Sequence, residues 1–143
     1  MRAAAALTLL LCLGAGCFTS ASPEECRVDA ECGGLVCTRV GECAAETRTM
    51  RIEWTVRGLA TDQTGACTGI GELEVMVSDP TIGADHVLRP VPCGVGSFYF
   101  DKLPLGYTVA TVSAYATDGA LLDSERGTVD GDGVVRFELL AGR

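Results

Sequence analysis

The reactive side chains that stand out in this chain are six cysteines between residues 26 and 93. They are Cys26, Cys32, Cys37, Cys43, Cys67 and Cys93. Structural zinc sites favour cysteine pairs two to four residues apart, and the C-x5-C-x4-C-x5-C spacing of the first four fits such a site badly. An even number of cysteines is typical of disulfide-bonded proteins in oxidising compartments. We therefore expect three disulfides and no metal at these residues.

Other residues that could do chemistry are sparse. Nucleophilic catalysis by Ser, Thr or Cys requires an adjacent base, and His86 is the only histidine in the chain. Its neighbours Val87 and Leu88 place it in an expected strand, which favours a structural role. We expect no catalytic residue and no cofactor, and hence a protein that is not an enzyme.

Two further places are weak candidates for ligand binding. Asp130 and Asp132, in the run Asp-Gly-Asp-Gly, have the spacing of carboxylates in calcium loops, although Asp-Gly repeats are explained more simply by a hairpin turn. Tyr99 lies between Phe98 and Phe100, so if those two rings point inward, Tyr99 points outward, where a sugar or peptide could stack on it. Trp54, on the apolar phase of its segment, is expected in the core.

The first seventeen residues have the build of an export signal. Arg2 is followed by uncharged residues from Ala3 to Leu13 and then by small residues. The apolar run is too short to cross a hydrocarbon core of about 30 Å. Gly14-Ala15-Gly16 leading into Cys17 resembles the lipobox of bacterial lipoproteins, in which the cysteine is lipidated and becomes the new N-terminus.

That resemblance implies a signal peptide at 1–16, a lipid on Cys17 and a tether at 17–25. It implies a protein of the cell envelope, held to a membrane by its lipid, and Phe18 after the cysteine favours the outer membrane of a Gram-negative bacterium. An ordinary secretory signal is the alternative. Without residues 1–16 the chain keeps ten basic and nineteen acidic residues, a formal charge of −9. Such a charge excludes nucleic acid as a partner, because binding a polyphosphate requires a basic patch.

Residues 26–44 are too short to build an apolar core, so disulfides must constrain them. Four cysteines allow three pairings. The segment resembles the small Cys-rich knots of bacterial lipoproteins and some secreted animal proteins. That resemblance favours the crossed pairing, Cys26 with Cys37 and Cys32 with Cys43. We call residues 26–44 the knot.

Residues 47–143 alternate with the period of β-strands. Met50, Ile52, Trp54 and Val56 alternate with polar residues, which predicts a strand with one apolar face. Glycine, proline and aspartate separate the other segments, and further strands are expected at 72–78, 86–91, 96–101, 107–117, 121–129 and 134–140. The pattern predicts an all-β fold, an antiparallel β-sandwich of about seven strands with 107–116 as a central strand. Cys67 and Cys93 are expected to pair across it.

One stretch of this part carries a recognisable pattern. Its residues are Gly94-x-Gly96-x-Phe98-x-Phe100-x-x-Leu103-Pro104-x-Gly106-Tyr107-x-Val109. It resembles the G-x-F-x-F-x-x-L-P-x-G-x-Y-x-V stretch of carboxypeptidase regulatory-like, transthyretin-like sandwiches, except that Tyr107 directly follows Gly106. The resemblance implies a binding, adhesion or spacer module that contacts envelope proteins or glycans. A secreted inhibitor or ligand carried by the knot is the alternative, followed by a small carbohydrate-binding module or a hydrolase.

Overall fold

The computed structural model describes residues 25–129 and 131–141. The expected signal peptide, Cys17, all of the tether except Glu25, and Asp130 lie outside the described residues. Within the described part, no helix is long and apolar enough to span a membrane.

The knot has almost no regular structure of its own. It consists of a 3-10 turn η1 (Asp29–Cys32) and a minimal hairpin of β1 (Val36–Cys37) and β2 (Cys43–Ala44). Its disulfides join Cys26 to Cys37 and Cys32 to Cys43, so the crossed pairing is confirmed. The sulfur-bearing residues Cys26, Cys32 and Cys37 form a buried cluster separate from the main core.

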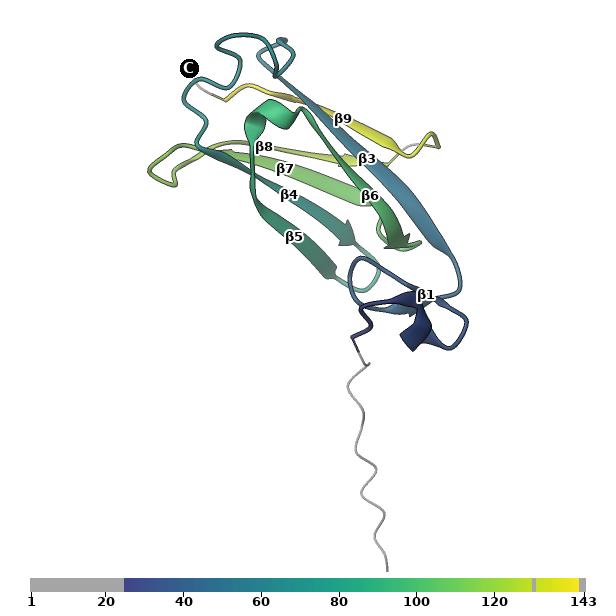
Figure 1. Cartoon of the computed structure of the whole chain (residues 1–143). Helices are drawn as coiled ribbons and strands as arrows, with labels where there is room; N and C mark the ends of the chain where they lie inside the picture. Colours follow the sequence, from purple (N-terminus) through teal and green to yellow (C-terminus); the bar gives the residue numbers. More distant parts are fainter. Residues whose placement is uncertain (1–24, 130, 142–143) are drawn as a thin grey trace, which may run out of the picture.

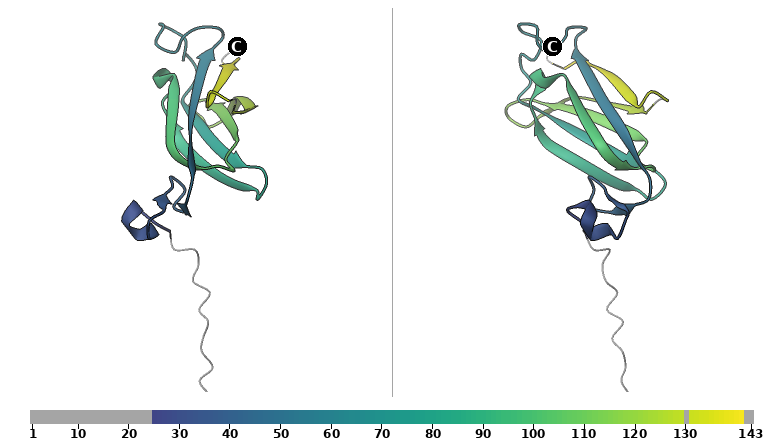
Figure 2. Two further views of the ribbon diagram at one scale, coloured as in Figure 1. Left: turned by 90° about the vertical axis from the view of Figure 1, so that its right-hand side faces the viewer. Right: turned by 45° about the vertical axis from the view of Figure 1, so that its right-hand side comes forward.

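Seven strands in two packed sheets form the rest of the described chain (Figures 1 and 2). The three-stranded sheet has the order β6-β3-β9 and the four-stranded sheet the order β5-β4-β7-β8. The strands are β3 (Thr47–Val56), β4 (Glu72–Asp79), β5 (Ala84–Val91), β6 (Ser97–Pro104), β7 (Val109–Tyr115), β8 (Leu121–Thr128) and β9 (Val134–Leu139). A short 3-10 turn, η2 (Cys93–Val95), precedes β6. The all-β sandwich expected from the alternation is therefore confirmed.

One pairing departs from the antiparallel expectation. β9 runs parallel to β3, with Arg51 opposite Val134 and Val56 opposite Leu139. The hairpin expected at Asp130–Gly133 is wrong, because the chain there crosses from the four-stranded sheet to the three-stranded one. β8 and β9 lie close together at Gly127 of β8, where an added Cβ would lie 3.0 Å from Val135 Cγ1.

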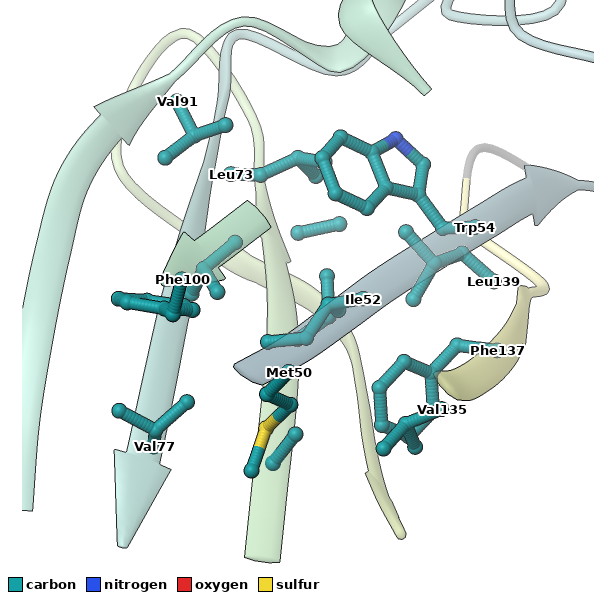
Figure 3. Close-up of a cluster of buried hydrophobic side chains, with 14 of the residues drawn as sticks. Met50, Ile52, Trp54, Leu73, Val77, Val91, Phe100, Val135, Phe137 and Leu139 are labelled. Atoms are coloured by element: carbon teal, nitrogen blue, oxygen red, sulfur yellow. The ribbon is translucent and has the colours of Figure 1, made fainter. Parts of the chain in front are cut away.

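The core lies between the sheets and is filled from β3 outward. Met50, Ile52, Trp54 and Val56 point from β3 toward the four-stranded sheet, as Figure 3 shows for the first three. Each buried side chain of this size stabilises the fold by about 1.5–3 kcal/mol. The following residues of the other strands pack around them: Leu73, Val75, Val77, Val91, Phe100, Leu103, Ala110, Val112, Ala114, Val135, Phe137 and Leu139. The expected core position of Trp54 is confirmed, and β7 lies centrally in its sheet, between β4 and β8.

The turn between β6 and β7 is built around Gly106 and Asp79. Asp79 is buried at the end of β4, where its Oδ1 accepts hydrogen bonds from the hydroxyl of Thr81 at 2.5 Å and from the Thr81 backbone N–H at 2.8 Å. These two bonds hold the pKa of Asp79 below its usual value, and the bond from the Thr81 hydroxyl has the larger effect. Tyr107 is buried beside them, and burial raises the pKa of its phenol. A Cβ at Gly106 would overlap the Asp79 carboxylate, so this position requires glycine.

Replacing Gly106 by alanine should therefore destabilise the sandwich. The added methyl can be accommodated only if Asp79 gives up its Thr81 hydrogen bonds or the turn moves, and such overpacking typically costs about 1–3 kcal/mol. Urea unfolding, followed by Trp54 fluorescence, measures the change. Gly94→Ala is the matched control, because no atom lies within 4 Å of its added Cβ. Equal stabilities of the two variants would contradict this account of the turn.

Candidate functional site

A groove of about 550 Å³ lies over the outer face of the three-stranded sheet. Its floor follows from the period of β3: the phase that alternates with the core residues carries Arg51, Glu53 and Thr55 outward. Arg136 and Glu138 of β9 lie beside them, since Glu53 is registered with Arg136 and Thr55 with Glu138. The same alternation that fills the core thus lines the groove with polar groups.

The loop 57–71 forms a wall of this groove through Ala60, Thr61 and Asp62. Thr61 Oγ1 donates to the Gly94 carbonyl at 3.4 Å, and Gly96 approaches the loop so closely that an added Cβ would lie 2.5 Å from Thr61 Oγ1. The Cys67–Cys93 disulfide joins the loop to η2, which confirms the expected pairing. The disulfide and the Thr61 contacts therefore hold the loop against this end of the three-stranded sheet.

Further hydrogen bonds fix the two ends of this disulfide. Arg57 Nη2 donates to the carbonyls of Gly65 and Ala66, both at 3.0 Å. Trp54 Nε1 donates to the Cys93 carbonyl at 3.0 Å, so the buried indole is tied to the cysteine. The groove wall is connected to the core through Trp54.

Three charged groups of the floor, Arg51, Glu53 and Arg136, form ion pairs with one another. Glu53 Oε1 lies 2.9 Å from Arg51 Nε, and Glu53 Oε2 lies 3.1 Å from Arg136 Nε. Arg136 Nη1 is also 3.8 Å from Asp132 Oδ2. The arginine side chains are more than half exposed, so these pairs contribute little stability. Their effect is to place a row of donors and acceptors across two neighbouring strands, β3 and β9.

Tyr99 lies on β6 at the edge of this polar face. Its side chain is 59% exposed, as expected from the alternation with Phe100, which is buried, and Phe98, which is half-buried. Tyr99 is the cross-strand neighbour of Arg51, and Ser97, two residues away on the same face, lines the groove. The one aromatic candidate from the sequence therefore stands next to the groove.

The other sequence candidates lie elsewhere. His86 is half-buried on β5, in the opposite sheet, with its ring edge-on to Phe100 at 6.2 Å between centroids. Asp132 Oδ1 accepts the Val134 N–H at 3.0 Å, so that carboxylate closes a local turn. Asp130, its proposed calcium-binding companion, lies outside the described residues.

One cluster of potential metal ligands is found among the described residues. It consists of Cys26, Cys32 and Cys37, whose sulfurs lie close together. All three sulfurs are in disulfides, which leaves no thiolate to bind a metal.

The knot is docked at the opposite end of β3 from the loop 57–71 (Figures 1 and 2). Arg39 forms a bidentate ion pair with Asp101, with Nε 2.5 Å from Oδ1 and Nη2 2.8 Å from Oδ2. Lys102 Nζ lies 2.9 Å from Asp29 Oδ2. The Arg39 hydrogen bond lowers the pKa of Asp101, and the Lys102 hydrogen bond lowers that of Asp29. The Arg39 N–H also donates to the Lys102 carbonyl at 2.9 Å. The knot and β6 thus each contribute one cation and one carboxylate to the contacts that join them.

Removing the Cys67–Cys93 disulfide should loosen the groove wall. The bridge closes a loop of 26 residues' separation, which the chain-entropy model values at about 3.5 kcal/mol. The variant Cys67→Ser/Cys93→Ser should lose that much free energy of unfolding, measured by urea titration with Trp54 fluorescence. Cys26→Ser/Cys37→Ser is the control, because it opens a bridge in the knot and should shift the Trp54 transition less. A larger shift in the control would mean that the sandwich depends on the knot.

Comparison with known proteins identifies no relative of this chain. No protein family model matches the chain, and no curated protein or solved structure is significantly similar to it. Its function must therefore be argued from the groove, the disulfides and the N-terminal sequence.

Proposed function

We propose that this chain is a non-enzymatic, lipid-anchored protein of the cell envelope that presents the groove to another envelope component. The observation that carries the proposal is the position of the groove. Its wall lies at the end of the sandwich opposite the knot (Figures 1 and 2), and the knot is the part of the fold that follows the N-terminal segment in the sequence. An anchor at the N-terminus would therefore direct the wall of the groove away from the membrane.

The maximum reach of residues 18–25 and the length of β3 support this arrangement. Residues 18–25 can span at most about 30 Å between a lipid on Cys17 and the knot, at about 3.5 Å per residue. The ten residues of β3 add about 33 Å between the knot and the groove wall, at about 3.3 Å per residue. The folded part acts as a spacer of about the same length as its tether.

The contacts within the groove support binding rather than catalysis. The Thr55 and Thr61 hydroxyls donate to the carbonyls of Phe137 and Gly94, so no base activates either of them. Glu53 is held between two guanidinium groups, which leaves it poorly placed to accept a proton from a substrate. His86 lies in the other sheet. These side chains are arranged to hold hydrogen-bond partners.

The anchor is tested by replacing Cys17 with serine. The native protein should enter the detergent phase of a Triton X-114 extract of the cells that make it, because acyl chains each contribute about 0.8 kcal/mol per buried CH₂. Cys17→Ser should move to the aqueous phase, while the control Cys12→Ser, which replaces the cysteine inside the expected signal peptide, should stay in the detergent phase. If Cys17→Ser partitions like the native protein, the anchor is wrong. Release of the native protein into the medium would favour the secreted ligand instead.

The groove is tested by photo-crosslinking in intact cells. A benzophenone-bearing residue at Thr55 should form adducts with an envelope component, because this position lines the groove. The same residue at Thr128, exposed on β8 of the other sheet, is the control and should form none. Mass spectrometry of the adducts identifies the component. Equal labelling from both positions would remove the groove as the binding surface.

A further inference from the structure

We propose that the ligand of the groove is an uncharged pyranose oligosaccharide that stacks one sugar ring on Tyr99. This rests on the proposed function of the groove as a binding site and names the class of ligand. Three features of the groove support this ligand: the paired charges of the floor, the exposed Tyr99 ring beside it, and the wall held by the Cys67–Cys93 disulfide.

The charges of the groove disfavour an ionic ligand of either sign. An anion would meet guanidinium groups whose charge Glu53 already offsets, and it would approach a chain of net charge −8. A cation would meet the same two guanidinium groups on either side of Glu53. Asp62 and Glu138, which also line the groove, add carboxylates that repel an anion.

A paired floor nevertheless offers directional hydrogen bonds. Each guanidinium has five N–H donors, of which one carboxylate engages at most two, and the carboxylate oxygens retain free lone pairs. Vicinal hydroxyl groups of a sugar are both donors and acceptors, so they can bind such a row without separating its ion pairs. A neutral polyhydroxylated ligand is the one whose chemistry matches this surface.

Tyr99 supplies the second element that a sugar requires. One face of a pyranose ring is largely C–H, and it packs against an aromatic face with a gain beyond the area buried. At 59% exposure the Tyr99 ring is free to be covered. Its cross-strand neighbour Arg51 leads directly to the floor, so one sugar on Tyr99 places the next over the paired charges.

The size and stiffness of the groove are consistent with this ligand. Its volume of about 550 Å³ falls within the range of about 300–1,000 Å³ usual for small-ligand sites. The wall is fixed by the Cys67–Cys93 disulfide and by Thr61, so binding does not have to order the loop. A preformed site is what a weakly hydrophobic ligand needs, because little burial energy is available to offset ordering.

The experiment is a glycan array probed with the detergent-solubilised full-length protein. The array carries uncharged tetrasaccharides to hexasaccharides of β-1,4-linked glucose, β-1,4-linked N-acetylglucosamine and α-linked mannose, beside sialylated and sulfated oligosaccharides. Binding to one or more of the uncharged series is expected, with affinity measured by calorimetry. Tyr99→Ala should weaken it about tenfold, as loss of a stacking surface implies, whereas Tyr99→Phe should retain it because the ring is kept.

One control variant and one further test variant separate a local effect from misfolding. Tyr115→Ala removes a ring from the outer face of the other sheet, where it packs against Arg89 at 4.0 Å, and should leave glycan binding unchanged. Glu53→Gln keeps the shape of the side chain but breaks the charge balance, and should weaken binding while the thermal unfolding temperature stays near the native value.

The outcomes distinguish the ligand class from the proposed function. Binding confined to charged glycans, or binding that survives Tyr99→Ala, would overturn the inference. If no glycan binds but Thr55 still crosslinks to an envelope protein, the groove remains a binding site and the sugar is wrong. If neither glycan nor crosslink is found, the inference and the proposed function of the groove both fail.

Discussion

The alternation of side chains along β3 is the constraint on which the rest of this structure depends. β3 is the central strand of its sheet, paired with β6 on one side and β9 on the other. Its even-numbered residues from Met50 to Val56 are buried, and Arg51, Glu53 and Thr55 form the groove floor. A shift of one residue would bury the charges and expose Trp54, so the register is strongly specified. Core and groove are two faces of one strand, and neither can change without the other.

The two ends of the sandwich depend on a different kind of interaction. Ala66 is the one buried residue in the loop 57–71, all of which is described, and only Cys67 and Ile70 pack partly against the main core, so hydrophobic packing alone does not fix its position. The Cys67–Cys93 disulfide and the Arg57 hydrogen bonds hold it instead. The knot similarly has two disulfides and a minimal core. Cross-links therefore fix what the core does not reach, as expected for small domains in oxidising compartments.

Strand positions could be predicted from the sequence, whereas the joining of the sheets could not. Segments of alternating or apolar residues between turn residues located all seven strands of the sandwich, although β7 is buried on both faces and β8 is only half-buried on one. The repeat at 130–133 predicted a hairpin, but β8 and β9 belong to different sheets. β9 pairs with β3 while Val135 and Phe137 pack against Gly127 of the other sheet, and no local pattern encodes these long-range contacts. Tyr99 could be predicted to point outward, but the groove beside it could not, since Thr61 and Gly96 meet only in the folded chain.

The junction between knot and sandwich determines how an N-terminal anchor would orient the groove. Exposed ion pairs such as Arg39–Asp101 contribute little stability by themselves. Here they act together with the Arg39 to Lys102 backbone hydrogen bond and with Val40, which packs against the main core. Only Ala45 and Glu46 separate β2 from β3, which leaves little chain to serve as a hinge. The knot therefore extends the long axis of β3. If Cys17 carries a lipid, the knot and the sandwich turn on that anchor as one body, and the groove turns with them.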